Sequence, residues 1–360
     1  MVKRLAQVSL AVFLVLALAT MATAAPNVAS TSNKGSLLVF PLVMATDDVE
    51  TYFFIANDDV KPIMVKCYWM DDNQDIEDFH FELTMNQPVS FSTTDGIGPP
   101  FARAGAEALG SLVCWAQDDA DVAPRKHNHL YGTAMLSSAD FDVMYNASAF
   151  RAGPGTLTAG LLQLNGGNPA VATTWEYDSC PNYLVANFVP RKREFGYNGS
   201  KASYPAMALW PCNQDLKQDR VGTVAKAKID IWNEYEVKYT GAYQCLKCFY
   251  EGYLYGAAGK KTVWPQSFGK EKFDIDILYT DIARMRVQAA NPALCKYPSS
   301  KGIDVAPFTP GFLGVMLYGD DEDNDPIIPI AGHTMVGAGA YYFGWVKYDT
   351  GGAVEEAGGR

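Results

Sequence analysis

A Cys-x-x-Cys motif formed by Cys245 and Cys248 has the spacing of a chemical site. Such a pair can be a redox centre, half of a metal site or two unrelated thiols. The preceding residues alternate as a β-strand, which points the two side chains to opposite faces and sets their Cα atoms about 10 Å apart. Because a disulfide needs Cα atoms within about 7 Å, we expect two independent structural cysteines and no catalytic dithiol. A turn at Leu246-Lys247 would instead allow a local bridge or a shared metal.

Seven cysteines are present, and the odd number leaves at least one that is free, intermolecular or a ligand. Cys67 and Cys114 each lie mid-strand in an apolar setting. We expect them to form a disulfide across the core of one β-domain, with two separate buried thiols as the alternative. The other cysteines are candidates for further disulfides or for metal ligation: Cys180, Cys212, Cys245, Cys248 and Cys295.

Two further groups of side chains could hold metal ions. His127 and His129 share one face if "KHNHLY" is a strand, which is a recurring half-site for zinc or copper. The neighbouring Arg125 and Lys126 disfavour a cation there, so an exposed polar strand edge is the alternative. The stretch "GDDEDNDP" supplies carboxylates that suit Ca²⁺, although it lacks the EF-hand pattern and also reads as a solvated hairpin tip. Its carboxylates are Asp320, Asp321, Asp323 and Asp325.

Familiar enzyme motifs are missing from the chain. It has no Gly-x-Ser-x-Gly, no His-Glu-x-x-His, no P-loop and no dinucleotide-binding fingerprint. Paired carboxylates for glycoside cleavage are assembled by the fold and not by local spacing, so they leave no such motif. We therefore expect no catalytic activity and no resident cofactor, with glycan cleavage kept as an alternative.

The elements that must position these side chains are β-strands. Residues alternate with period two in "IMVKCYWM", "DFHFELTM", "AKAKIDI" and "KFDIDILY", which indicates half-buried antiparallel strands. Pro- and Gly-rich turns separate them, and only "FARAGAEALG" and the neighbourhood of "YTDIARMR" suit short helices. This pattern predicts an all-β protein of two antiparallel β-sandwich domains, immunoglobulin-like or jelly-roll-like.

The N-terminus reads as a secretory signal peptide. Lys3 and Arg4 precede a short apolar run and the triplet Ala22-Thr23-Ala24, so we expect cleavage after residue 24. The formal charge of −11 then becomes −13, because two cations leave with the signal. Such an acidic chain disfavours nucleic acid and anionic membranes as partners. No later apolar run predicts a membrane span, so we expect a periplasmic or extracellular protein.

We divide the chain at changes in composition. The expected segments are a signal peptide (1–24), a linker (25–34), a first β-sandwich domain (35–150), a junction (151–160), a second β-sandwich domain (161–350) and a disordered tail (351–360).

Seven stretches of the chain carry a resemblance to known proteins: "GSLLVFPLV", "TYFFIANDDVKPIMVKCYWMDD", "LVCWA", "NHLYGTA", "YDSCPNYLVANF", "LWPCNQDL" and "WNEYEVKYTGAYQCLKC". They resemble a family of uncharacterised exported bacterial proteins of unknown function. The resemblance implies bacterial export and β-sandwich architecture, and it carries no activity or site residue.

These observations lead to one expected function and two alternatives. We expect an exported, non-catalytic envelope or extracellular protein with a structural or interaction role, including binding of a protein partner or self-assembly. The first alternative is a metal-binding or redox protein that uses Cys245 and Cys248, together with His127 and His129. The second is a glycan-binding or glycan-cleaving protein that uses surface aromatic residues.

Overall fold

The computed structural model describes most of the chain between residues 28 and 350, and every structural statement below concerns these residues. The ranges are 28–31, 33–71, 76–101, 108–118, 123–139, 142–190, 192–195, 201–217, 223–247, 249–253, 278–292, 295, 306–307, 310–321, 328–342 and 344–350. The signal peptide and the C-terminal tail that the sequence predicts lie outside them, as do residues 25–27 and 32 of the predicted linker.

Strands dominate the described residues, which confirms the all-β class, and the only other regular element among them is a 3-10 turn, η1 (Pro169–Val171). The strands are β1 (Leu37–Ala45), β2 (Glu50–Asn57), β3 (Ile63–Asp71), β4 (Ile76–Leu83), β5 (Pro88–Ser92), β6 (Ala108–Gln117), β7 (Leu130–Ser137), β8 (Asp142–Asn146), β9 (Ser148–Phe150), β10 (Leu161–Leu164), β11 (Cys180–Phe188), β12 (Lys192–Phe195), β13 (Lys201–Pro211), β14 (Asn213–Asp215), β15 (Thr223–Asn233), β16 (Lys238–Lys247), β17 (Tyr250–Tyr253), β18 (Ala283–Ala290), β19 (Ala306–Pro307), β20 (Phe312–Asp321), β21 (Ile328–Thr334), β22 (Val336–Tyr342) and β23 (Gly344–Lys347).

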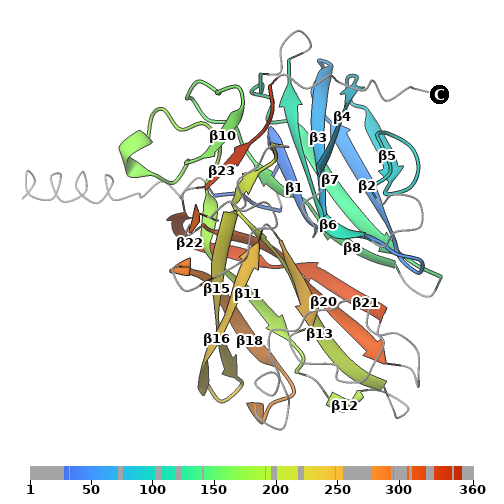
Figure 1. The fold of residues 1–360 in the computed structure, drawn as a ribbon, viewed down its shortest axis with the longest axis vertical. Coiled ribbons are helices and arrows are strands. Elements are labelled where there is room, and N and C mark those ends of the chain that lie inside the picture. The colour runs from blue at the N-terminus through green and yellow to red at the C-terminus, as the bar shows by residue number, and fades with distance from the viewer. Residues whose placement is uncertain are drawn as a thin grey trace, which may run out of the picture.

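The first sandwich is one nine-stranded sheet that folds over on itself (Figure 1). Strand β1 pairs with β6 and β9, and its register shifts between Phe40 and Val43. Beyond that irregularity β1 meets β2 only where Ala45 faces Glu50. The strands therefore divide into one layer of β4, β3, β6, β1 and β9, and a second layer of β5, β2, β7 and β8.

Aromatic rings fill the space between these two layers. Phe53 projects from β2 and lies 5.2 Å from Phe40, 5.3 Å from Trp69 and 5.4 Å from Phe91, measured between ring centroids. All four side chains are buried. Rings bury large apolar areas, so this cluster holds the layers together.

The second sandwich packs two further antiparallel sheets face to face. One sheet has the order β16-β15-β18-β11-β22, and the other has the order β12-β13-β20-β21. Ala227, Ile229 and Met285 of the first sheet share a buried cluster with Leu209 and Met316 of the second. The alternation in "AKAKIDI" therefore predicts the correct inward face of β15.

A third core joins the two sandwiches. Tyr68 and Trp115, on the outer face of the β3-β6 layer, share a cluster with Tyr177, Trp210 and Tyr348 from the later part of the chain. A small sheet of β10, β23 and β14 contributes to the same core. Strand β3 is consequently buried on both faces, and the prediction that it is half-buried is wrong.

One expected helix is a strand. Residues of "YTDIARMR" form the start of β18, where Ala283 and Met285 are buried and Arg284 points outward. Ala, Met and Arg favour a helix, but helix propensities of ordinary residues differ by less than about 1 kcal/mol per residue, and pairing with β15 and β11 outweighs that preference. The other expected helix, in "FARAGAEALG", lies mainly outside the described residues, and its last three residues begin β6.

The predicted junction packs tightly against the chain that follows it. Arg151 forms an ion pair with the buried Asp178, with 2.9 Å between Nε and Oδ2. The backbone N–H of Gly153 donates to the carbonyl of Glu176 at 2.6 Å. Within the part of the chain that the structure describes, no helix is long and apolar enough to cross a membrane.

Candidate functional site

The structure joins Cys67 of β3 to Cys114 of β6, the pair expected from the sequence. These two residues face each other directly in the β3–β6 register. The bridge therefore links neighbouring strands of one layer, and the expectation that it crosses the core between layers is wrong. Both residues are fully buried, and both point into the core of the first sandwich.

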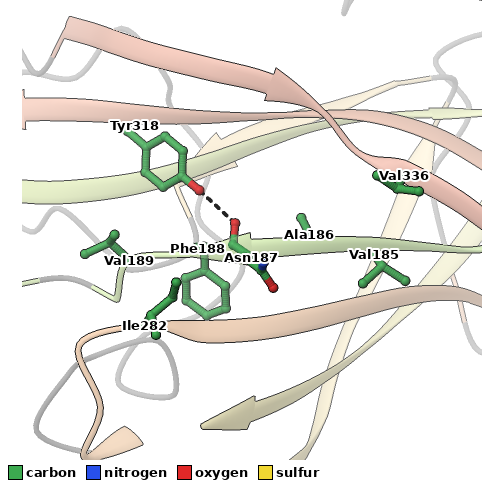
Figure 2. A pocket seen from close by; sticks show the side chains of 8 residues that line it. All are labelled: Val185, Ala186, Asn187, Phe188, Val189, Ile282, Tyr318 and Val336. Atoms are coloured by element: carbon green, nitrogen blue, oxygen red, sulfur yellow. Dashed lines mark hydrogen bonds between the residues drawn. The ribbon is translucent and has the colours of Figure 1, made fainter. Parts of the chain in front are cut away.

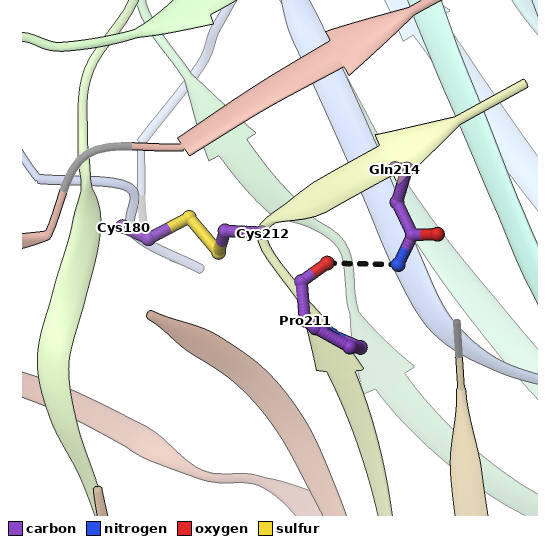
Figure 3. Close-up of a disulfide and its surroundings, with 4 residues drawn as sticks. All are labelled: Cys180, Pro211, Cys212 and Gln214. Atoms are coloured by element: carbon purple, nitrogen blue, oxygen red, sulfur yellow. Dashed lines mark hydrogen bonds between the residues drawn. A yellow bond between two sulfur atoms is a disulfide. The ribbon is translucent and has the colours of Figure 1, made fainter. Parts of the chain in front are cut away.

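Two more disulfides lie in the later part of the chain. Cys180, at the start of β11, is joined to Cys212, between β13 and β14 (Figure 3). Cys245 of β16 is joined to Cys295, which lies outside the Cys-x-x-Cys motif. Cys248 lies outside the described residues. Strand β16 extends through Cys245 to Lys247, so the local geometry is the extended one that the sequence indicates.

His127 and His129 come together at one end of the first sandwich, with ring centroids 5.2 Å apart. Asn57 uses its amide to donate to the carbonyls of Lys61 and Thr84, so its Oδ1 is an acceptor. His127 Nε2 lies 2.8 Å from that oxygen and therefore donates to it.

Each imidazole also faces its own carboxylate. His127 Nδ1 lies 3.7 Å from Asp59 Oδ2, and His129 Nδ1 lies 3.0 Å from Asp58 Oδ1. Lys34 also contacts Asp58 and forms an ion pair with it. Each histidine therefore has polar partners of its own, and these contacts hold the turn that follows β2.

The predicted metal sites stay predictions. Across the described ranges, no group of three or more His, Cys, Asp or Glu side chains is placed to hold a metal ion. Asp320 and Asp321 end β20, opposite Ser203 and Ala202 of β13. Asp323 and Asp325, the other two proposed calcium ligands, lie outside the described residues.

His127 should make stability depend on pH. Burial lowers the pKa of His127, against the opposing charge of Asp59. The unfolded chain then binds more protons than the folded chain below about pH 6.5, so stability is full above that pH and falls as the pH drops through it. We expect His127→Gln to reduce this loss, since a neutral amide can still donate to Asn57. Urea midpoints at pH 7.5 and pH 5.5 measure the effect, and His129→Gln is the matched control. An unchanged pH dependence in His127→Gln would contradict the assignment.

The outward face of the β16-β15-β18-β11 sheet carries a concentration of positive charge. We call it the basic face. The register places Lys228 opposite Gln288, Asp230 opposite Arg286 and Trp232 opposite Arg284. On the other side of β15, Lys238 lies opposite Trp232 and Tyr243 lies opposite Lys228. The cations of this face are Lys226, Lys228, Lys238, Arg284 and Arg286, and Asp230 is the acidic residue among them.

Cations and aromatic rings alternate across the strands of the basic face. Arg286 lies between Tyr183 and Trp232, with its guanidinium 5.7 Å and 5.3 Å from the two ring centroids. Lys238 and Arg284 also approach Trp232, at 5.3 Å and 5.6 Å. Each such contact is weakly attractive when exposed. This ladder of alternating cations and rings therefore mainly orders the long side chains.

Asp230 anchors this ladder. Its side chain is buried beneath Arg286, Lys238 and Lys228, at 2.9, 3.4 and 3.6 Å between nitrogen and oxygen. Burial alone would raise the pKa of Asp230, but the hydrogen bond from Arg286 and the two lysine charges outweigh it and hold the pKa below its ordinary value. One carboxylate cannot balance five cations, so the face keeps an excess of positive charge.

An apolar pocket of about 540 Å³ adjoins the basic face along β11 (Figure 2). Val185 and Asn187 of its lining pair with Arg286 and Arg284 in the neighbouring strand. Tyr318 closes one side, and its hydroxyl donates to the carbonyl of Asn187 at 2.8 Å. Val336 and Ile282 at the rim are 67% and 50% exposed, so apolar surface borders the cations.

The basic face is not predicted by any single stretch of the sequence. Its signal was present in two short patterns, since Lys226 and Lys228, like Arg284 and Arg286, are two residues apart and share a strand face. The two pairs are more than fifty residues apart in the sequence, and only the β15–β18 register brings them together.

No protein-family model matches the chain, and no curated protein matches it. Among solved structures it is similar to a glycosyl hydrolase family 2 member from Bacteroides cellulosilyticus DSM 14838, with 10% identity over 85% of this chain and 30% of that chain and a TM-score of 0.15. It is also similar to the CupB6 tip adhesin from Pseudomonas aeruginosa, with 10% identity over 85% of this chain and 93% of that chain and a TM-score of 0.10. The chain thus spans less than a third of the length of the hydrolase, and likenesses this low carry no functional argument.

Proposed function

We propose that the chain is an exported, non-catalytic protein that works in the envelope or outside the cell as a structural or interaction component. The basic face is the observation that carries this proposal. Five cations stand on one sheet face of a chain whose formal charge is −11, and aromatic rings contact four of them. A preformed charged face of this kind suits binding to an anionic surface.

The disulfides support the proposed location. One disulfide lies within the first sandwich, a second joins β11 to the β13–β14 connection, and a third joins β16 to Cys295. Disulfides form and persist in oxidising compartments, which agrees with an N-terminus that reads as a signal peptide.

The test is retention of the exported protein at the cell envelope. The full chain is produced in a bacterial host, and the fraction that sediments with the envelope is measured with the N-terminal sequence of the mature protein. We expect a start at Ala25 and retention of the wild type. We also expect Lys226→Gln with Arg284→Gln to be released, because the basic face loses two charges. Lys61→Gln, at an exposed site of the first sandwich, is the control. Retained Met1, or equal retention of all forms, would contradict the proposal.

A further inference from the structure

The charge of the chain is divided unevenly between its two parts. Residues 28–150 contain 18 Asp and Glu against 6 Lys and Arg, a net charge of −12. Residues 151–360 contain 22 acidic against 21 basic residues, a net charge of −1. The acidic excess therefore belongs almost entirely to the part of the chain that forms the first sandwich, while the basic face lies on the second.

Carboxylates gather at one end of the layer formed by β5, β2, β7 and β8. We call this group, made of Asp47, Asp48, Glu50, Asp95 and Asp142, the acidic patch. Glu50 lies opposite Ser137 of β7, and Asp142 accepts a hydrogen bond from that serine at 2.6 Å. The hydroxyl of Tyr52 donates to Glu50 at 2.9 Å. Glu50, by this hydrogen bond and its charge, raises the pKa of Tyr52, with smaller effects of burial and of Asp142 and Asp95, which places these acids together.

The acidic patch has no cation of its own among the described residues. Four of its five members are exposed, and the side-chain partners of Glu50 are the hydroxyls of Tyr52, Thr94 and Ser92. Lys34 and Arg125 form ion pairs with other carboxylates, Asp58 and Asp118 respectively. The patch therefore carries negative charge that the first sandwich does not neutralise.

The two charged surfaces face different sides of the molecule. In Figure 1 the strands β15 and β16 lie on the left of the lower sandwich, whereas β2, β5 and β8 lie on the right of the upper one. The basic face and the acidic patch of one chain are thus too far apart to neutralise each other. Exposed apolar side chains adjoin both, with Val336 and Ile282 beside the basic face and Phe54 and Met144 on the layer that carries the acidic patch.

We propose that this chain associates head to tail, with the basic face of one copy bound to the acidic patch of the next copy. The inference rests on the proposed interaction function and names a second copy of the chain as the partner. Two different surfaces meet in such a contact, so it is heterologous, and repeating it produces a ring or an open filament. The hairpin tip that carries Glu234 and Glu236 lies beyond Trp232 and sets the limit of the basic face.

Sedimentation velocity of the purified mature chain tests this association. We expect complexes larger than one chain at about 20 mM salt and single chains at about 500 mM salt, because exposed charges are screened within a few ångströms at high ionic strength. Charge reversal at two positions of the basic face (Lys226→Glu with Arg284→Glu) or of the acidic patch (Asp48→Lys with Asp142→Lys) should each weaken association more than about tenfold, since it cancels most of the net charge of that surface and sets two like charges against the other surface. Neither pair of substitutions touches the hydrogen bond between Arg286 and Asp230.

Mixing the two charge-reversed proteins provides the decisive result. One variant keeps the acidic patch intact and the other keeps the basic face intact, so the mixture should form one-to-one pairs through these two surfaces although neither variant associates alone. Glu82→Lys, at an exposed position of β4, is the control and should associate as the wild type does. A wild type that stays single at low salt, or a mixture that stays single, would overturn the proposal. Single wild-type chains that bind heparin through the basic face would assign that face to an anionic glycan. Because these measurements use purified protein, they stand apart from export and envelope retention.

Discussion

Replacing Trp115 by alanine is expected to lower the free energy of unfolding by about 3–5 kcal/mol, the range found for buried large aromatic residues. Trp115 is fully buried in β6, on the outer face of the first sandwich. Its ring stacks on Tyr68 at 5.2 Å and meets Tyr348 at 4.7 Å between centroids. The substitution removes the ring that joins the first sandwich to the end of the chain.

The same substitution should also change how the protein unfolds. The wild type should unfold in one transition followed by circular dichroism in urea, because the third core couples the two sandwiches. Trp115→Ala should shift that transition to lower urea and broaden or divide it. Trp115→Phe is the matched control, since the indole N–H has no hydrogen-bond partner among the described residues and a phenyl ring keeps most of the packing. Equal losses in both variants would show that ring packing is not the cause.

Strand alternation predicts the inner faces of the sheets but not which outer faces are buried. Ile63, Val65 and Cys67 share the core of the first sandwich, as their period-two spacing indicates. Tyr68 and Met70 alternate with them, so the same half-buried pattern predicts that they face solvent. They are buried because residues from 152 to 348 cover that face, and a local pattern contains no information about so distant a cover.

At the candidate site, too, the sequence predicts the direction of a charged side chain but not how deeply it is buried. The outward direction of Lys226, Lys228 and Asp230 follows from the sequence, because Ala225, Ala227 and Ile229 are the apolar set. The burial of Asp230 cannot be predicted from the sequence, since it depends on Arg286 in another strand. Disulfide connectivity in the second sandwich is similar, because spacing alone does not choose among Cys180, Cys212, Cys245 and Cys295.

The apolar mid-strand settings of Cys67 and Cys114 predict that they pair, and the structure adds that they are cross-strand neighbours. Removal of this bridge is the second large effect that we expect. The two cysteines are 47 residues apart, and closing a loop of that length in the unfolded chain is worth about 4 kcal/mol in the chain-entropy model.

The double variant Cys67→Ala with Cys114→Ala should therefore lose about 4 kcal/mol or more of stability. A further loss comes from the space left by two buried sulfur atoms. Cys245→Ala with Cys295→Ala is the matched control, because its loop of 50 residues has nearly the same entropy while Cys245 and Cys295 are only half-buried. The difference between the two double variants in urea unfolding then measures packing at the first bridge, provided that peptide mapping finds the remaining disulfides intact. If the control loses as much stability as the buried pair, packing around Cys67 and Cys114 contributes nothing beyond the entropy of loop closure.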